Sequence, residues 1–323
     1  SLIGYTDSQE TFDEYFAYVC EQFMYYDQLF DIYDSYDDIN NMKTINDQAG
    51  IAPVEVDQAI IDLLLEAQYF ESLSNHEFDV TFGAVFKVWH SYRELANEND
   101  GVGNIPEIDE LNEAQLHTGM DKLIINDEAN TVYLTDENAS LDVGGIAKGF
   151  AAEAIAQGLM DLGLDIGIVD AGGNNRIIGS KPDGELWKVG IQNPNGNGSL
   201  VIVSSDVEMS FVTSGDYQRY YVDEQGNRYH HIIDPSTLYP ATHYRSVSII
   251  TDDSGQADAL STSLFTLGFE EGLALIDEYR ALGYTIEVIW ITSLDETLDY
   301  PNSIHTDEFN IYYTDGLIGK LSY

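Results

Sequence analysis

The chain has 323 residues, of which 44% are hydrophobic, so it can bury a sizeable core as one large domain or two. Its 13 Lys and Arg residues stand against 57 Asp and Glu residues, a formal net charge of -44 at pH 7. Nucleic acid and anionic membrane faces are excluded as partners, because affinity for both comes largely from neutralising phosphates. The charge indicates a solvated surface tolerant of salt or acid; the alternative, recruitment of divalent cations, requires a particular site.

Cys20 is the only cysteine, which excludes an intramolecular disulfide, a thiolate zinc cluster and a redox pair. It lies in a helical pattern of apolar residues, and we expect it to fill the core. No apolar run approaches the roughly 18 residues that span a bilayer. Because the chain starts at Ser1, without Met or a signal peptide, we expect that any export leader or lipid anchor was removed or was never present.

The front of the chain shows helical periodicity. Residues 8–33 place aromatic and apolar side chains at steps of three and four, the pattern of an amphipathic helix. Further helices are predicted over 56–72 and 85–92, and an acidic, glycine-containing surface loop over 97–106.

From Lys122 onwards the pattern favours strands. A hairpin is predicted over 123–126 and 131–134, and a short strand over 141–143. Further strands are predicted over 166–170, 187–192, 200–203, 207–212, 246–251 and 286–292, and helices after Gly149 and over 256–265 and 270–282. Helices at the front, mixed strands and helices behind and no 20–50-residue period favour an α+β (mixed α/β) chain without repeats. No linker marks a clean domain boundary, so we expect a single domain over 1–323, with a helical front part of about 1–120 and a mixed sheet part of about 121–323.

The stretch 214–241 carries more polar chemistry than a plain hairpin requires. Two Tyr-rich runs flank a turn, and hydroxyl, carboxylate, guanidinium and imidazole groups follow within about twenty residues: Ser214, Asp216, Arg219, His230, His231 and Asp234. On a strand, His230 and His231 point to opposite faces, so one could act as a general base while the other packs or hydrogen-bonds.

Two glycine clusters follow predicted strands. In 142–149, Lys148 lies among glycines before a helix, where backbone N–H groups can hold an anion, although a tight turn is the simpler alternative. It is not a Walker motif, because Gly149 follows the lysine where Ser or Thr is required. Close packing of turn and sheet explains the second cluster, 171–174.

A third motif combines a carboxylate with hydroxyls. On a helix, Asp258, Ser261 and Thr262 share one face, and such oxygens suit Mg²⁺. Helix N-capping by Asp258 is the alternative. Asp79 is similarly open to two interpretations, a ligand contact or a cap.

Seven motifs in order resemble the FAD:protein FMN transferases, the ApbE-type family. They are FDVTFG at 78–83, LDVGGIAKG at 141–149, AGGN at 171–174, WKVGIQNP at 187–194, TSGDY at 213–217, HHIIDP at 230–235 and ADALST at 257–262. The resemblance covers about 28–272. Two positions depart from the family pattern: Leu238 stands where many members have Gly, and Asn174 where an acidic residue is frequent.

This resemblance implies a two-lobed fold with the FAD site between the lobes and Mg²⁺ at the pyrophosphate. The implied reaction transfers the FMN half of FAD to a Thr or Ser hydroxyl of an acceptor protein, and AMP leaves. The alternatives are a FAD pyrophosphatase, which forms FMN and AMP, and a non-catalytic FAD carrier. Family members act mostly outside the cytoplasm, so we expect a cell-surface or membrane-anchored lipoprotein.

The resemblance also assigns roles to single residues. Asp258, Thr262 and Ser261, with the backbone oxygen of Gly145, would hold the metal, and the ligand types do not distinguish Mg²⁺ from Mn²⁺. His231 would assist deprotonation of the acceptor hydroxyl, in a catalytic set with Asp258. The residues that would line the FAD site are Glu77, Phe78, Asp79, Asp142, Lys148 and Ile233.

Overall fold

The computed structural model describes residues 1–196 and 198–323, which divide into two compact units. Unit 1 contains Ser1–Met24, Ile146–Gly215 and Thr242–Tyr323, and unit 2 contains Tyr25–Gly145 and Asp216–Ala241. Helix α1 (Gln9–Phe30) begins in unit 1 and ends in unit 2. The mixed α/β class predicted from the sequence is confirmed, whereas the single domain over 1–323 stays a prediction.

Unit 1 is built on an eight-stranded sheet with the order β1-β5-β6-β9-β12-β13-β15-β14. Neighbouring strands pair antiparallel throughout the described part of this sheet. Every residue of β12 is buried, as expected for a strand covered on both faces. The strands are β1 (Leu2–Gly4), β5 (Gly167–Asp170), β6 (Asn175–Ile178), β9 (Ser210–Gly215), β12 (Ser246–Thr251), β13 (Ile286–Ser293), β14 (Ser303–His305) and β15 (Phe309–Tyr313).

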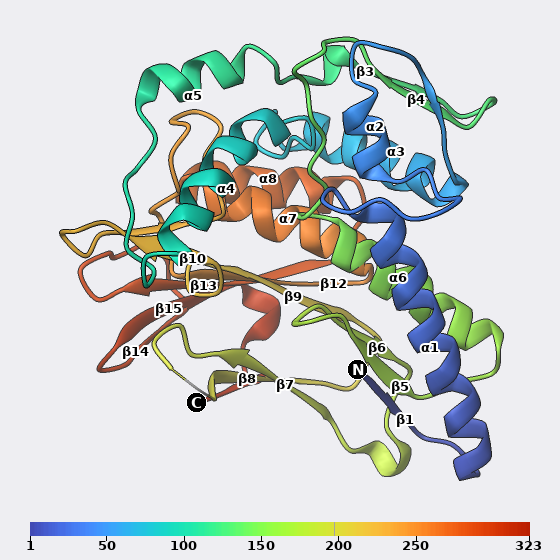
Figure 1. Ribbon diagram of the computed structural model, residues 1–323. Helices are drawn as coiled ribbons and strands as arrows, with labels where there is room; N and C mark the ends of the chain where they lie inside the picture. The colour runs from blue at the N-terminus through green and yellow to red at the C-terminus, as the bar shows by residue number, and fades with distance from the viewer. Residues whose placement is uncertain (197) are drawn as a thin grey trace. The chain divides into compact units, whose positions relative to one another are not determined.

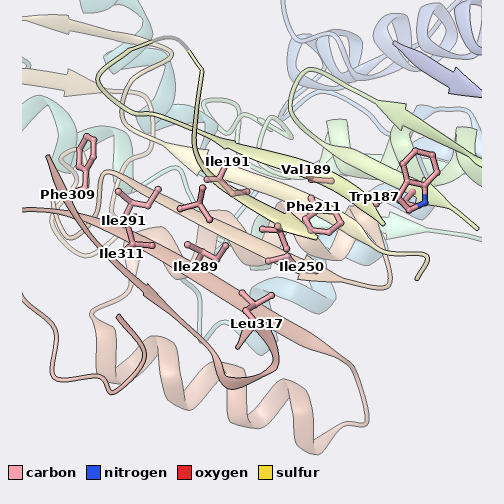
Figure 2. Close-up of a cluster of buried hydrophobic side chains, with 13 residues drawn as sticks. Trp187, Val189, Ile191, Phe211, Ile250, Ile289, Ile291, Phe309, Ile311 and Leu317 are labelled. Carbon is pink, nitrogen blue, oxygen red and sulfur yellow. The ribbon is translucent and has the colours of Figure 1, made fainter. Parts of the chain in front are cut away.

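Helices cover one face of this sheet and a small sheet covers the other. Figure 1 shows α7 (Ser254–Thr266) and α8 (Phe269–Ala281) on the first face, with α6 (Ala147–Asp161) nearer β5 and β6. The small sheet contains β7 (Trp187–Gln192), β8 (Ser199–Ser205) and β16 (Leu321–Ser322). Figure 2 shows the core between the two sheets, where Val189 and Ile191 of β7 meet Phe211, Ile250 and Ile289.

Unit 2 combines helices with two small sheets. Its core is aromatic: the Trp89 ring stacks on Tyr229 with 6.0 Å between centroids, and its Nε1 donates to the carbonyl of Leu238 at 2.9 Å. The helices are α2 (Met42–Asp47), α3 (Gln58–Leu73), α4 (Gly83–Asn97) and α5 (Ile108–Gln115), and the sheets are β2-β4-β3 (Val54–Glu55, Thr131–Leu134, Leu123–Asn126) and β10-β11 (Tyr220–Val222, Arg228–His230). Short 3-10 helices in the two units span Met120–Lys122, Pro182–Gly184 and Asp315–Leu317.

Several predicted elements are confirmed with their bounds, namely β3, β4, β7 and β12. The predicted strand over 141–143 is wrong. Only Ser140 bridges Phe82, and the Asp142 N–H donates to the Val80 carbonyl, so this stretch is an irregular segment. The predicted strand 207–212 begins only at Ser210, because the Ser205 hydroxyl accepts the Val207 N–H and turns the chain.

Cys20 does not fill the core, because it is exposed on α1, where the buried side chains are those of Val19 and Leu29. The sequence also did not predict β2, β6, β14, β15, β16, α2 or α5, which are short and whose stability comes from tertiary pairing. No helix in the described residues is long and apolar enough to cross a bilayer.

A buried ion network joins α6 to the start of α7. Arg176 of β6 is 5% exposed, and its Nε lies 2.7 Å from Oε2 of Glu153 on α6. The same Glu153 oxygen accepts the Ser254 N–H at the start of α7 at 2.9 Å. A second carboxylate, Glu208, lies 2.6 Å from Arg176 Nη2.

Replacing Arg176 with Met should therefore destabilise unit 1. The partly buried Glu153 would lose the buried guanidinium that neutralises it, which lowers the free energy of unfolding by about 3 kcal/mol. The more exposed pair of Lys43 and Asp47 provides the control, and Lys43→Met should cost less than about 1 kcal/mol. Urea denaturation of both variants measures the difference, and equal losses would contradict the assigned role of the network.

Candidate functional site

In unit 1 the predicted metal and phosphate residues meet where α6 crosses α7. The Gly149 N–H donates to Oδ2 of Asp258 at 2.9 Å, and Lys148 Nζ lies 3.2 Å from the same oxygen. A Cβ on Gly149 would lie 2.1 Å from the Ser254 carbonyl oxygen, so only glycine permits this approach. The Asp258 side chain is 4% exposed and that of Lys148 46%, so the carboxylate is fixed while the ammonium reaches solvent.

Hydroxyls surround the same turn of α7. Ser261 Oγ and Thr262 Oγ1 both donate to the Asp258 carbonyl, at 2.9 and 3.2 Å. Ser214 Oγ, from the end of β9, lies 2.8 Å from Ser261 Oγ. The cap of α7 is Asp253, whose side chain accepts the Gln256 N–H, so the alternative that Asp258 caps this helix is wrong. Asp258 sits inside the helix with its carboxylate turned to α6.

This set of oxygens fits a hard cation. A carboxylate and hydroxyls are the ligand types that Mg²⁺ prefers, and one carboxylate is usual when substrate phosphates complete the shell. Ser261 is fully buried, whereas Thr262 and Ser214 are partly accessible. No group of three His, Cys, Asp or Glu side chains suited to a metal ion occurs among the described residues. Gly145, the remaining predicted ligand, belongs to unit 2.

In unit 2 the segment 77–79 lies beside Asp142. The Phe78 N–H donates to the Ser74 hydroxyl at 3.0 Å, and Phe78 itself is 4% exposed. The N–H of the partly buried Glu77 donates to the Ser74 carbonyl. Because the Asp142 N–H bonds the Val80 carbonyl at 2.8 Å, the structure brings these predicted FAD residues together.

Both aspartates of this region are perturbed. Asp79 Oδ1 accepts the Thr81 N–H at 2.7 Å and the Thr81 hydroxyl at 2.6 Å, but burial outweighs these bonds and raises the pKa of Asp79. The predicted capping role of Asp79 is wrong: Phe82 occupies the N-cap of α4 without a side-chain cap bond, and Asp79 instead forms a local turn with Thr81. Burial also raises the pKa of Asp142, against the Gly144 N–H bond and the charges of Arg219, His90 and Arg93. Perturbed carboxyl groups next to each other are typical of functional sites.

The two histidines have different environments. His230 is buried, and its Nδ1 accepts the Ile232 N–H at 3.2 Å, so its Nε2–H donates to the Ala241 carbonyl at 2.7 Å. That tautomer commits both ring nitrogens of His230 to the backbone. His231 follows the end of β11 and is partly exposed. Ile233 is 3% exposed in the core that contains Phe82 and Trp89, and its role at FAD stays a prediction.

Near these segments Asn75, His76 and Leu238 adopt the left-handed conformation that favours glycine, and Asn is the residue type of the three that tolerates it best. His76, just before 77–79, has φ 73°, and its exposed imidazole pairs with Glu71. Leu238, where the family pattern favours Gly, has φ 66° and is 3% exposed. Its N–H donates to the Asp234 carbonyl at 2.8 Å. The unusual backbone is therefore retained at Leu238, with burial in place of glycine's freedom.

Comparisons with known proteins agree with this picture. The family model described as the ApbE family matches residues 7–286. A FAD:protein FMN transferase of Treponema pallidum is 38% identical over 258 residues, 75% of this chain and 69% of the relative, and that of Haemophilus influenzae is 31% identical over 72% of this chain and 67% of the relative. The crystal structure of the ApbE protein from Thermotoga maritima has a TM-score of 0.75 at 30% identity, covering 90% of this chain and 89% of that one. The flavin transferase ApbE from Vibrio cholerae, at 24% identity, shares the fold with a TM-score of 0.74 over 95% of this chain and 90% of that one.

Replacing Asp79 with Asn should change stability in a pH-dependent way. The raised folded pKa means that the stability linked to this carboxyl is fully present below the unfolded pKa and is lost as pH rises through the folded pKa. Asp79→Asn should therefore stabilise the protein at pH 7 and lose this advantage near pH 3. Urea denaturation across this range measures the effect.

Asp136 in the same unit gives a control of opposite sign. Its pKa is lowered, chiefly by the hydrogen bond with His117, so its contribution is present above the unfolded pKa and lost as pH falls. Asp136→Asn should destabilise at pH 7 and be neutral near pH 3. If Asp79→Asn and Asp136→Asn change the free energy of unfolding in the same direction at pH 7, the interpretation of Asp79 is refuted.

Glycine substitutions at His76 and Leu238 should separate the effect of backbone strain from that of side-chain burial. At His76, glycine relieves about 1 kcal/mol of strain and removes an exposed ion pair worth less than about 1 kcal/mol, so stability should stay level or rise. At Leu238, glycine relieves the same strain but removes a buried side chain, for a net loss of about 1–2 kcal/mol. Thermal melting ranks the two variants, and a larger loss at His76 would contradict this account.

Proposed function

We propose, because the chain belongs to the ApbE family, that it is a Mg²⁺-dependent FAD:protein FMN transferase acting on a Thr or Ser hydroxyl of an acceptor protein. The observation that supports this most directly is the buried Asp258 carboxylate, held by Gly149 and paired with the solvent-reaching Lys148. A pyrophosphate substrate is served by a metal-binding carboxylate and a mobile cation, and here α7 supplies the carboxylate and α6 the ammonium, 3.2 Å apart.

The proposed reaction breaks the phosphoanhydride bond between the two halves of FAD and forms a phosphoester bond to the acceptor. The acceptor hydroxyl oxygen forms a bond to the phosphorus of the FMN half of FAD, and the P–O bond to the AMP half breaks. AMP leaves with the electron pair, and the hydroxyl proton passes to a base. His231 is the proposed base, because its neighbour His230 is committed to the backbone on both nitrogens.

Lys148 and Asp258 have linked tasks in this proposal. A buried carboxylate must keep a positive partner, which in the structure is the ammonium of Lys148. When Lys148 turns to a phosphoryl oxygen and neutralises its growing charge, Asp258 needs another cation. Asp258 and Thr262, supported by Ser261 and with the Gly145 carbonyl as a further ligand, would hold Mg²⁺, which when bound supplies charge neutralisation at the pyrophosphate.

The remaining assignments follow from the family. Glu77, Phe78, Asp79, Asp142 and Ile233 are proposed to contact FAD. The acceptor is proposed to be an exported or membrane-associated flavoprotein. The enzyme itself is proposed to act outside the cytoplasm, attached to the membrane by a lipid anchor.

The test incubates the protein with FAD and Mg²⁺, with and without an acceptor domain carrying a threonine of the flavinylation type. Acceptor mass and free AMP are followed together. An FMN-sized mass gain that EDTA abolishes supports the transferase. AMP without a mass gain, after a second acceptor domain has also failed, supports a FAD pyrophosphatase instead, and bound FAD with neither product supports a carrier.

Asp258→Asn should abolish transfer while leaving the fold intact. The amide keeps the size of the side chain but removes the charge that attracts Lys148 and the metal, so we expect a loss of at least about 100-fold in rate. Asp253→Asn is a matched control on the same helix, because Asn caps helices as well as Asp and transfer should be unchanged. Transfer rates at saturating Mg²⁺ check this, and near-normal transfer by Asp258→Asn would overturn the proposed site.

A further inference from the structure

Ser214 brings a hydroxyl to the proposed metal residues from an element other than their helix. It lies on β9, paired with Val247 of β12, while Asp258, Ser261 and Thr262 lie on α7. Its Oγ is 2.8 Å from Ser261 Oγ and 3.5 Å from Thr262 Oγ1. Packing of α7 on β9 thus closes the group of oxygens from the sheet side.

The direction of these hydrogen bonds follows from counting protons. A hydroxyl has one proton, and Ser261 and Thr262 both donate theirs to the Asp258 carbonyl. When Ser261 donates its proton to the Asp258 carbonyl, Ser214 donates to Ser261 across the 2.8 Å contact. In that arrangement the oxygen of Ser214 keeps lone pairs that can accept from a bound water or face a cation.

Accessibility points the same way. Ser261 is 0% exposed, whereas Ser214 and Thr262 are partly accessible on the helix-facing side of β9. The fully buried Ser261 suits a supporting role. The two partly accessible hydroxyls, Thr262 from the helix and Ser214 from the strand, lie beside the buried carboxylate of Asp258.

We propose that Ser214 is a positioning residue of the divalent-cation site, which orients the hydroxyls of Ser261 and Thr262 and offers its own oxygen to the cation or to a water bound to it. This rests on the proposed function, because the cation site itself is part of that proposal. The strand then holds the ligand face of α7 in register, as outer-shell hydrogen bonds do for metal ligands generally.

The test measures Mn²⁺ binding to the full-length chain by the loss of the free-ion signal in electron paramagnetic resonance, without substrate or turnover. Ser214→Ala should raise the Kd for Mn²⁺ about tenfold, and Ser214→Thr, which keeps the hydroxyl, should restore it. Ser248→Ala is the matched control. Ser248 is a strand serine whose hydroxyl lies 2.7 Å from that of Thr213, a residue adjacent to Ser214 that points to the opposite face of the sheet.

The melting temperatures of the variants without metal show whether a loss of Mn²⁺ binding comes from lost positioning of the ligands or from general destabilisation. If Ser214→Ala unfolds, Ser214→Cys keeps the volume with a poor ligand for hard cations and gives the same comparison. Normal Mn²⁺ binding by Ser214→Ala, while Asp258→Asn binds none, overturns the role of Ser214 and leaves the proposed function standing. Normal binding by Asp258→Asn overturns the metal site and the role of Ser214 together.

Discussion

The close approach of α6 and α7 at Gly149 is the constraint on which the site in unit 1 depends. The absence of a side chain lets the Ser254 carbonyl and the Asp258 side chain reach the α6 backbone. The N–H of the same Ser254 is held by Glu153, which Arg176 neutralises. One residue at the start of α7 is thus fixed on both sides, and the carboxylate one turn later falls opposite the Gly149 N–H.

Fixing the carboxylate determines what the rest of the site can do. Asp258 is too buried to be left uncompensated, so a cation must always accompany it. Lys148 is one of only 13 basic residues against 57 acidic ones, so its position beside this carboxylate indicates a specific chemical role. The carbonyl of the same aspartate collects the protons of Ser261 and Thr262, which leaves their lone pairs for a cation or another hydroxyl. The side chain of Asp258 therefore holds Lys148 and the Gly149 N–H, while its backbone carbonyl positions the hydroxyls of Ser261 and Thr262.

Much of this architecture could be predicted from the sequence. Strand β7 alternates buried apolar with exposed residues, β12 is rich in β-branched residues, and both were predicted with their bounds. The i, i+3, i+4 spacing placed Asp258, Ser261 and Thr262 on one helical face. The stretch 141–143 was misassigned because its apolar residues are buried without pairing as a strand. The contribution of Ser214 could not be predicted from spacing, since the contact spans 47 residues and arises only when α7 packs on β9.

The residue types contradict the local backbone preferences most clearly in unit 2, next to the residues predicted to bind FAD. Backbone preference alone would place glycine at positions 76 and 238, and the chain has His and Leu there instead. Each departure has its own compensation, an ion pair with Glu71 for His76 and burial in the aromatic core for Leu238. Trp89 bonds the carbonyl of Leu238, so the strained residue also anchors the turn that follows His231 and Ile233. At Leu238 burial outweighs the backbone strain, whereas at His76 the exposed ion pair at most offsets it, and strained residues of this kind are typical of functional segments.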